Sequence, residues 1–230
     1  MPEAVCEIRS KNVDSLSLLA EKIEEAVRTH FVSYGIQPKK RKIWVVTWSY
    51  FKVERLPEKE ETIIIKSWQN KKRGMLYPRK SSVYTKNGER IVDCAQYFVQ
   101  CDAKSRKIDV RDNEMDKISC IEMIDEPQIP SFQVEFSEQL TKKMIRTVKR
   151  KYIDINGHMN NTIYIKWLED LLVSENLNFK LLKNLWIQYE KELMVDAMVE
   201  IQYCIYAKKV YVCGMRNKKE YFRCVAELFA

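Results

Sequence analysis

The feature that most constrains the fold of this chain is an internal repeat, in which a helical segment is followed by a run of strands. Apolar residues recur at helical spacing in residues 14–35 and again in residues 161–175. Strand-like segments follow both helices, at 43–56, 61–68, 75–86 and 89–102 and then at 185–193, 197–207, 209–216 and 220–230. Each half therefore predicts a curved, mostly antiparallel sheet wrapped around a helix with one apolar stripe.

The repeat predicts two units joined by a connection. We expect the first unit to cover residues 1–125, a linker to cover 126–140, and the second unit to cover 141–230. The segment before the second helix is polar and contains Pro127 and Pro130, which is typical of a connection. Asn87-Gly88, between two strand-like segments, predicts a two-residue hairpin turn.

Composition agrees with this fold and excludes several classes of protein. Hydrophobic residues make up 46% of the 230 residues, which is enough for a sizeable core. We find no apolar run of the roughly 18 residues needed to span a bilayer and no secretory signal, so we expect a cytoplasmic protein. The 7 cysteines are odd in number and show no C-x-x-C spacing, and there are only 2 histidines, so we expect no metal and no cofactor.

The two halves differ most just before their helices. Residues 152–164, YIDINGHMNNTIY, hold several hydrogen-bonding side chains around a glycine, whereas the first half has RSKNVDSLSL at the matching place. The polar residues of this stretch are Asp154, Asn156, His158, Asn160 and Asn161. Capping and turn formation would be the better explanation for a single Asn or Asp. Five such groups within eight residues exceed what a cap requires, and this favours a functional site.

A second difference concerns an acidic residue. Matching residues 51–65 to residues 187–201 places Glu192 where the first half has Leu56. We expect Glu192 to lie on a strand, Ile187–Leu193. An acid on such a strand usually faces solvent, and the pattern alone does not separate Glu192 from Glu190.

The string Asp-Ile-Asn-Gly-His-Met-Asn-Asn, followed by Tyr164 and an amphipathic helix, resembles the motif of hot-dog thioesterases. Over nearly its whole length, including the strand IWVVTWSYFKVERLP, the chain resembles the acyl-acyl-carrier-protein thioesterases of bacteria and plants. These are tandem hot-dog proteins, so the resemblance implies an α+β fold of two hot-dog repeats. It also implies a hydrolase that releases a free fatty acid from an acyl carrier protein and so ends fatty acid synthesis.

By this resemblance the catalytic residues fall on Asp154, Asn156, His158 and Glu192. Plant members commonly have a cysteine at the next position, where this chain has Leu193, so no thiol nucleophile is available there. Base-assisted attack by water remains, with either Asp154 or Glu192 as the base; we favour Asp154, with Glu192 assisting. We expect the oxyanion donors among backbone N–H groups left free at Gly157, Met159 and Asn160.

The resemblance also places the acyl chain in the first repeat and the chemistry in the second. Trp44, Trp48 and Phe51 are candidates for lining the acyl pocket, although core packing explains them equally well. The net charge of +8 suits an acidic partner. We expect that partner to be an acyl carrier protein with a phosphopantetheine-linked acyl chain, which docks at Lys149, Arg150 and Lys151. The run Lys71-Lys72-Arg73 is a second basic cluster.

Other functions stay open from the sequence. An acyl-CoA thioesterase would use identical thioester chemistry, and a non-catalytic acyl-binding hot-dog protein would share the fold. Nucleic-acid binding is suggested by charge alone, without any recognition motif, so we expect no nucleic-acid partner. A homodimer is compatible with the sequence.

Overall fold

The computed structural model describes residues 3, 5–36, 41–111, 113–122, 136 and 138–229. The chain divides into two compact units. The first consists of residues 1–47 and 56–129, and the second consists of residues 48–55 and 130–230. Of the predicted linker 126–140, residues 126–135 and 137 lie outside the described residues, so its bounds stay a prediction.

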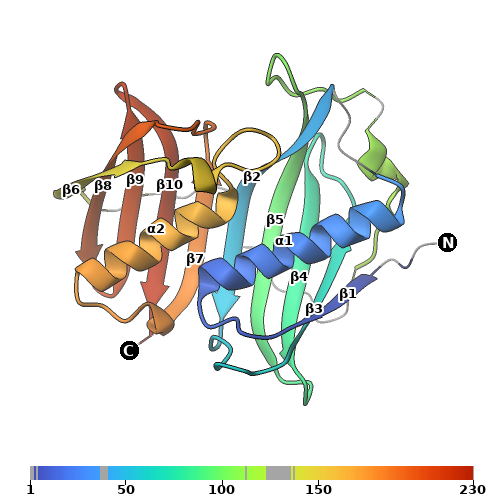
Figure 1. Ribbon diagram of the computed structural model, residues 1–230, viewed down its shortest axis with the longest axis horizontal. Helices are drawn as coiled ribbons and strands as arrows, with labels where there is room; N and C mark the ends of the chain where they lie inside the picture. Colours follow the sequence, from blue (N-terminus) through green and yellow to red (C-terminus); the bar gives the residue numbers. More distant parts are fainter. Residues whose placement is uncertain are drawn as a thin grey trace. The chain divides into compact units, whose positions relative to one another are not determined.

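The first unit combines one long helix with an antiparallel sheet. Its elements are β1 (Val5–Ser10), α1 (Leu16–Ser33), β2 (Lys42–Val53), β3 (Ile63–Gln69), β4 (Tyr77–Thr85), β5 (Arg90–Asp102) and the 3-10 turn η1 (Glu114–Lys117). The strands lie in the order β1-β3-β4-β5-β2, and neighbouring strands from β1 to β5 run antiparallel. In Figure 1 the helix α1 lies across β3, β4 and β5.

The second unit is built in the same way. Its elements are β6 (Lys142–Thr147), η2 (Arg150–Tyr152), α2 (Asn161–Ser174), η3 (Phe179–Leu181), β7 (Leu182–Tyr189), β8 (Met198–Tyr206), β9 (Lys209–Arg216) and β10 (Lys219–Leu228). The strand order is β7-β10-β9-β8-β6, with the part of β2 from Trp48 onward paired to β7. Every one of these pairs is antiparallel.

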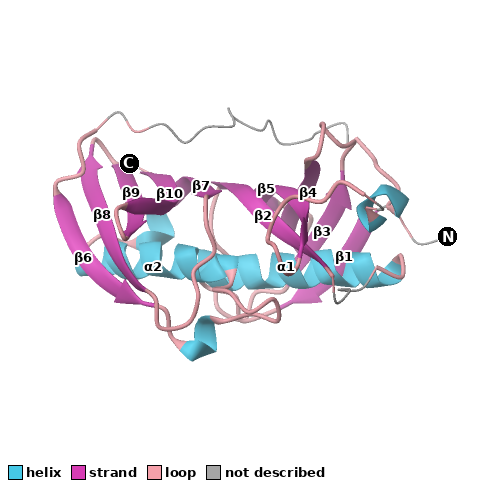
Figure 2. Cartoon of the chain, turned by 90° about the horizontal axis from the view of Figure 1, so that it is seen from above, coloured by secondary structure: helices cyan, strands magenta, loops and turns pink. Residues whose placement is uncertain are grey.

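The strand orders of the two units correspond element by element, which confirms the predicted repeat. Replacing β1, β2, β3, β4 and β5 by β6, β7, β8, β9 and β10 gives β6-β8-β9-β10-β7. This is the strand order of the second unit read from its other edge. In each unit the helix lies against one face of its strands (Figure 2). The chain therefore has the predicted α+β architecture of two hot-dog repeats.

Both helices form where the apolar stripes predict them. On α1 the stripe residues Leu16, Leu19, Ile23, Val27 and His30 are buried. On α2 the buried stripe consists of Tyr164, Trp167, Leu168, Leu171 and Leu172. Each helix begins after a polar cap, since the side chains of Ser15 and Asn160 accept hydrogen bonds from the backbone N–H of Leu18 and Thr162.

The structure differs from the local predictions at three places. First, the strands β1 and β6 were not predicted, because they are short edge strands of polar composition, VCEIRS and KKMIRT. The Asn87-Gly88 hairpin forms, but its turn is longer than two residues: the N–H of Thr85 bonds to the carbonyl of Glu89, and Gly88 has a φ of +86°. Glu192 lies beyond β7 rather than on it, because β7 ends at Tyr189.

The described part of the connection is more than a polar linker. Met115 and Ile118, in and after η1, are 0% and 3% exposed. Cys120 forms a parallel bridge with Gln69 at the end of β3. Residues 113–122 therefore pack against the first unit and contribute buried side chains to its core. Neither of the described α-helices has the length and apolar character needed to cross a membrane.

Candidate functional site

A closed loop between β6 and α2 carries the polar motif. The N–H of Asp154 donates to the carbonyl of His158 at 2.9 Å, and the N–H of Gly157 donates to the carbonyl of Asp154 at 3.1 Å. The Asp154 carboxylate folds back on this loop, since its Oδ1 accepts from the N–H of Asn156 at 2.8 Å. Gly157 has a φ of +83°, which favours glycine at that position. The loop therefore holds the Asp154 side chain in one orientation.

His158 lies between two carboxylates. Its Nδ1 is 3.8 Å from Oδ2 of Asp154, and its Nε2 is 3.6 Å from Oε1 of Glu192. The imidazole side chain is 8% exposed, whereas the carboxylates of Asp154 and Glu192 are 19% and 23% exposed. The structure thus places two of the predicted catalytic side chains, Asp154 and Glu192, on either side of a third, the buried ring of His158. Both carboxylates are partly exposed to solvent.

The carbonyl of Met159 sets the tautomer of His158. It lies 3.1 Å from Nδ1, so in the neutral ring Nδ1 carries the proton and donates to it. The Nε2 atom then presents its lone pair toward Glu192. It is buried and has no hydrogen-bond partner among the described residues. A proton taken up at Nε2 would be held between the imidazole and the Glu192 carboxylate.

Backbone hydrogen bonds outside the β7 strand hold Glu192 in place. After Tyr189 the N–H groups of Glu190 and Lys191 both donate to the carbonyl of Tyr221, at 2.9 and 3.1 Å, which ends the regular ladder. The carbonyl of Leu193 then accepts the N–H of Met159 at 2.7 Å. This bond ties the Glu192 segment to the motif loop. Leu193 itself is 0% exposed. The position at which plant members commonly have a cysteine therefore holds a core side chain here.

Tyr164 belongs to the surroundings of this site as well as to the core. Its ring packs edge-on against Tyr189 and Phe222, at centroid distances of 5.1 and 4.7 Å. Burial raises the pKa of its hydroxyl, and the charge of Glu192 raises it further. The sequence shows Tyr164 after the motif and in the apolar stripe, but its proximity to Glu192 arises from the fold.

The expectation of free backbone N–H groups is wrong. The N–H of Gly157 donates to Asp154, that of Met159 donates to Leu193, and that of Asn160 donates to the carbonyl of Tyr152 at 2.9 Å. These bonds close the loop and attach it to its neighbours. The side-chain amide of Asn156 lies beside the same carboxylate, with its Nδ2 3.5 Å from Oδ2 of Asp154.

The aromatic residues of β2 pack in or beside the core. Trp48 and Phe51 are 1% and 2% exposed. Trp48 stacks on Tyr50, with ring centroids 6.2 Å apart, and Trp44 packs on Phe31 of α1 at 5.8 Å. Trp48 and Phe51 are thus buried and Trp44 is half-buried, and the role of the three candidates in an acyl pocket stays a prediction.

The basic residues before the motif form a surface. Lys149, Arg150 and Lys151, at the 3-10 turn η2, are all exposed. Two large apolar side chains are also exposed. Ile155, within the motif, is 78% exposed, and Met194, two residues after Glu192, is 47% exposed. Cationic and apolar groups therefore flank the segments that carry the site.

Two hot-dog repeats with an Asp-Asn-His loop in only one of them agree with the resemblance to one class, the tandem hot-dog thioesterases. Comparison with known families agrees. Residues 5–118 match the Acyl-ACP thioesterase N-terminal domain and residues 135–228 match the Acyl-ACP thioesterase C-terminal domain, where ACP is acyl carrier protein. The chain belongs to the acyl-ACP thioesterase family.

Curated relatives are similar at low identity. A chloroplastic acyl-ACP hydrolase of Cuphea viscosissima is 23% identical over 214 residues, which covers 84% of this chain and 50% of that protein. The chloroplastic dodecanoyl-ACP hydrolase of Cinnamomum camphora is 22% identical over 207 residues, covering 81% and 53%. The chain thus spans about half the length of the curated relatives it matches.

Solved structures share the fold over nearly the whole chain. The 12:0-ACP thioesterase from Umbellularia californica has a TM-score of 0.83 at 17% identity, covering 100% of this chain and 95% of that one. An acyl-ACP thioesterase from Bacteroides thetaiotaomicron has a TM-score of 0.80 at 16% identity, covering 98% of both chains. The likeness to these structures shows the tandem hot-dog fold.

Proposed function

We propose that this protein hydrolyses the thioester of a fatty acyl-ACP and releases the free fatty acid. The observation that carries the proposal is the position of His158, within 4 Å of both Asp154 and Glu192 on a loop that only the second repeat has. A thioester hydrolase needs a base for water, a donor for the oxyanion and a proton for the departing thiol. The three functions have candidates here.

Asp154 is the proposed base. Its Oδ1 is fixed by the N–H of Asn156, which orients the carboxylate, and the side chain is partly exposed to water. Asp154 takes one proton from water as the water oxygen bonds to the thioester carbonyl carbon. The negative charge that develops on the carbonyl oxygen accepts a hydrogen bond from the side-chain amide of Asn156.

Collapse of this intermediate re-forms the carbonyl and breaks the carbon–sulfur bond. The departing sulfur needs a proton, and the pair of His158 and Glu192 is suited to hold one between Nε2 and Oε1. Asp154 then releases to solvent the proton that it took from water, and the pair regains one at Nε2 through the partly exposed Glu192 carboxylate, because Nδ1 already carries the proton donated to the Met159 carbonyl. The products are a fatty acid and the free thiol of the phosphopantetheine arm, and no proton is left over on the enzyme.

The carrier docks, in this proposal, on the basic and apolar surface that flanks the site. Lys149, Arg150 and Lys151 supply positive charge for an acidic carrier, and Ile155 supplies exposed apolar area. The first repeat, residues 1–125, houses the acyl chain, with Trp44, Trp48 and Phe51 near it. We also propose a cytoplasmic location and a homodimer, whereas the curated relatives are chloroplastic proteins.

Replacement of Asp154 by asparagine tests the proposal. The amide keeps an oxygen that can accept the Asn156 N–H but removes the base, so we expect kcat to fall by roughly 10³-fold with unchanged folding. The matched control is Asp196→Asn, an exposed acid with a φ of +61°, a conformation that asparagine also tolerates. Free fatty acid is measured, and the far-UV circular dichroism of both variants is compared with that of the wild type.

Full activity of Asp154→Asn would mean that the base lies elsewhere. The choice of carrier is tested separately, with acyl-ACP and acyl-CoA substrates of matched chain length. Higher kcat/KM on acyl-ACP supports the proposal, whereas equal or better turnover of the CoA esters would make an acyl-CoA thioesterase the correct assignment.

A further inference from the structure

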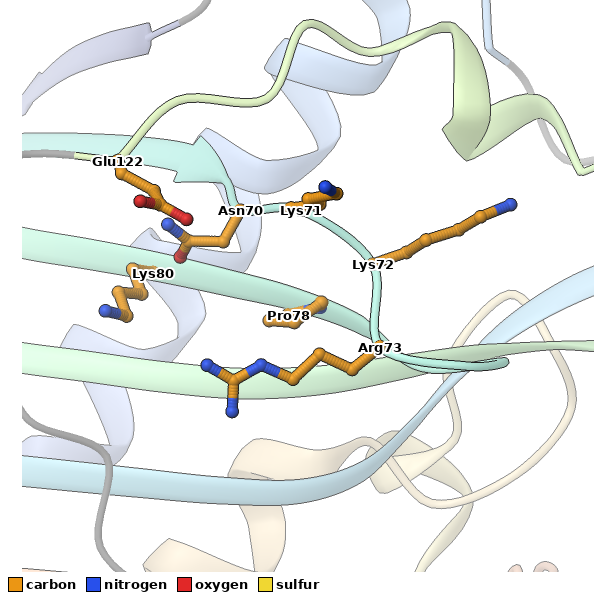
Figure 3. A pocket seen from close by; sticks show the side chains of 7 residues that line it. All are labelled: Asn70, Lys71, Lys72, Arg73, Pro78, Lys80 and Glu122. Carbon is orange, nitrogen blue, oxygen red and sulfur yellow. The ribbon is translucent and has the colours of Figure 1, made fainter.

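The interior of the first unit contains an arginine that is almost completely withdrawn from water. This residue, Arg79, is on β4 and is 1% exposed. Its neighbours on the strand, Pro78 and Lys80, line the pocket shown in Figure 3. Because side chains alternate along a strand, Arg79 points to the opposite face, where Nδ1 of His30 on α1 lies 2.6 Å from its Nη2. The guanidinium is therefore enclosed between the sheet and the helix.

The groups that contact Arg79 are neutral. Its Nε donates to the hydroxyl of Ser67 at 3.1 Å, and its Nη2 donates to Nδ1 of His30. Since an arginine N–H can only donate, Nδ1 accepts, and the ring proton of His30 lies on Nε2, 3.0 Å from the carbonyl of Glu3. The ring of Phe31 lies against the guanidinium, with its centroid 5.1 Å from Cζ. None of these groups supplies a negative charge.

The positive charge of Arg79 is not balanced by a carboxylate. Within the described ranges of the chain, its guanidinium forms no ion pair, and its buried Nη1 has no hydrogen-bond partner. Burial lowers the pKa of Arg79 to about 9, so the group stays charged at neutral pH. The thiol of Cys6, which pairs with Ser67 across β1 and β3, is close enough to act on this charge. Burial raises the pKa of that thiol, so it stays protonated and neutral.

A buried charge without a counter-ion is strongly unfavourable, so the surroundings of Arg79 favour an anionic ligand. Ser67 and His30 use the N–H of Nε and one N–H of Nη2, which leaves both N–H groups of Nη1 and the second one of Nη2. A carboxylate matches this edge of the guanidinium with two parallel hydrogen bonds. Its single negative charge neutralises one arginine, whereas a phosphate dianion would leave a negative charge buried.

Aromatic rings continue from this cation on the side of Phe31. Phe31 is 8% exposed, and its ring centroid lies 6.2 Å from that of Phe98 and 5.8 Å from that of Trp44. Trp44, a candidate for lining the acyl pocket, is half-buried, so these rings lead from the enclosed guanidinium to a partly exposed side chain. An apolar lining with a single charged group suits a ligand that has an anionic head and an aliphatic chain.

We propose that Arg79 binds the carboxylate of a fatty acid, whose aliphatic chain lies along Phe31 and Trp44. The proposal rests on the proposed function for the origin of the ligand, because a fatty acid is the product of the hydrolysis. A carboxylate at the far end of an acyl chain that is still attached to its carrier offers the same recognition chemistry. Two sources of the ligand therefore need to be distinguished.

Titration calorimetry of the full chain with octanoate and with 1-octanol tests the proposal without turnover. The two probes share an aliphatic chain, and only octanoate carries a charge. We expect saturable binding of one octanoate per chain, about tenfold tighter than that of octanol. Arg79→Gln should abolish this preference and leave octanol binding unchanged, whereas Arg79→Lys should keep part of it. Arg28→Gln, which removes an exposed arginine of α1, is the control and should bind both probes like the wild type.

A wild type that binds octanoate no more tightly than octanol would overturn the proposal, and this comparison does not depend on the folding of any variant. A folded Arg79→Gln variant that keeps the preference for octanoate would overturn it as well. Because octanoate contains no thioester, a failure of the proposed hydrolysis would leave these binding results unchanged.

Acyl-ACP substrates that differ only in a carboxylate at the far end of the chain distinguish the two sources. A higher kcat/KM for the carboxylated substrate, lost in Arg79→Gln, would assign the site to the acyl chain of the substrate. An equal or lower kcat/KM, together with tight binding of octanoate, would assign it to the free fatty acid.

Discussion

The two repeats share one framework but place different residues at two equivalent points. Three residues before its helix the first repeat has Val13, and the second has His158. Three residues after the strand that follows the helix, the first repeat has Leu56 and the second has Glu192. Val13 and Leu56 are 2% and 7% exposed, so both are ordinary core residues. The second repeat has an imidazole and a carboxylate where the first has a buried apolar pair.

The length of the preceding loop differs as well. Residues 11–15 connect β1 to α1, whereas residues 148–160 connect β6 to α2. The longer loop has room for the turn at Asp154–Gly157 and still ends in a capping residue, as the shorter one does. A hot-dog repeat can therefore gain a site through a longer loop and two substitutions, without any change of strand order.

The first repeat also buries charge, but inside its core. Arg79 is 1% exposed; its Nη2 is 2.6 Å from Nδ1 of His30, and its Nε donates to the hydroxyl of Ser67 at 3.1 Å. His30 Nε2 lies 3.0 Å from the carbonyl of Glu3. This arrangement fits a neutral His30 that accepts from Arg79 and donates to Glu3. These groups bond to one another, although the buried Nη1 of Arg79 has no hydrogen-bond partner among the described residues, whereas the two carboxylates beside His158 are partly exposed.

The largest expected effect on stability comes from Leu56, the buried apolar residue of the first repeat that corresponds to Glu192. Leu56→Ala removes a buried side chain and should lower the free energy of unfolding by about 2–5 kcal/mol. The kcat of the remaining folded enzyme should stay close to that of the wild type. Urea unfolding and steady-state kinetics measure the two effects. A kcat reduced as strongly as that of Asp154→Asn would mean that the first repeat takes part in the chemistry.

The buried pair of His30 and Arg79 predicts a pH dependence of stability. Burial, and then the charge of Arg79, lower the pKa of His30 from 6.5 to about 4. The imidazole therefore binds a proton more readily in the unfolded chain than in the folded one. The free energy of unfolding is unaffected by this group above about pH 6.5 and falls by about 3 kcal/mol as the pH drops to about 4. Unfolding curves at several pH values should show a shallower dependence for His30→Gln. Identical slopes for the variant and the wild type would contradict this account.

The smallest effects concern the two caps. Ser15→Ala and Asn160→Ala each remove an accepted backbone hydrogen bond, so each should cost about 1 kcal/mol of stability. Only Asn160→Ala should also lower kcat, by roughly tenfold, because Asn160 follows the His158 loop directly. Thermal unfolding and kinetics of the two variants check this. An equal loss of kcat in both would remove the functional distinction between the two loops.

The sequence predicts the repeat well because its signals are local. Helices expected at 14–35 and 161–175 are found at Leu16–Ser33 and Asn161–Ser174, since their apolar stripes are continuous. The matching of Leu56 to Glu192, made on weak sequence similarity, agrees with the structural framework. The edge strands β1 and β6 escape prediction because half-exposed polar strands show no distinctive pattern.

The site is predictable only in part. The string around His158 marks the motif loop, but the availability of its N–H groups depends on partners such as the Leu193 carbonyl, which the chain supplies from a distant segment. The end of β7 at Tyr189 is likewise set by Tyr221 on β10. Long-range contacts of this kind, including the one between His30 and Arg79, leave no trace in local sequence.

The double variant His158→Val plus Glu192→Leu tests the central claim most directly, because it gives the second repeat the residues that the first has at the same points. We expect a folded protein, with circular dichroism and thermal unfolding like those of the wild type, whose hydrolysis of acyl-ACP is reduced by at least roughly 10³-fold. A folded double variant that keeps kcat within tenfold of the wild type would contradict the assignment of the chemistry to this pair.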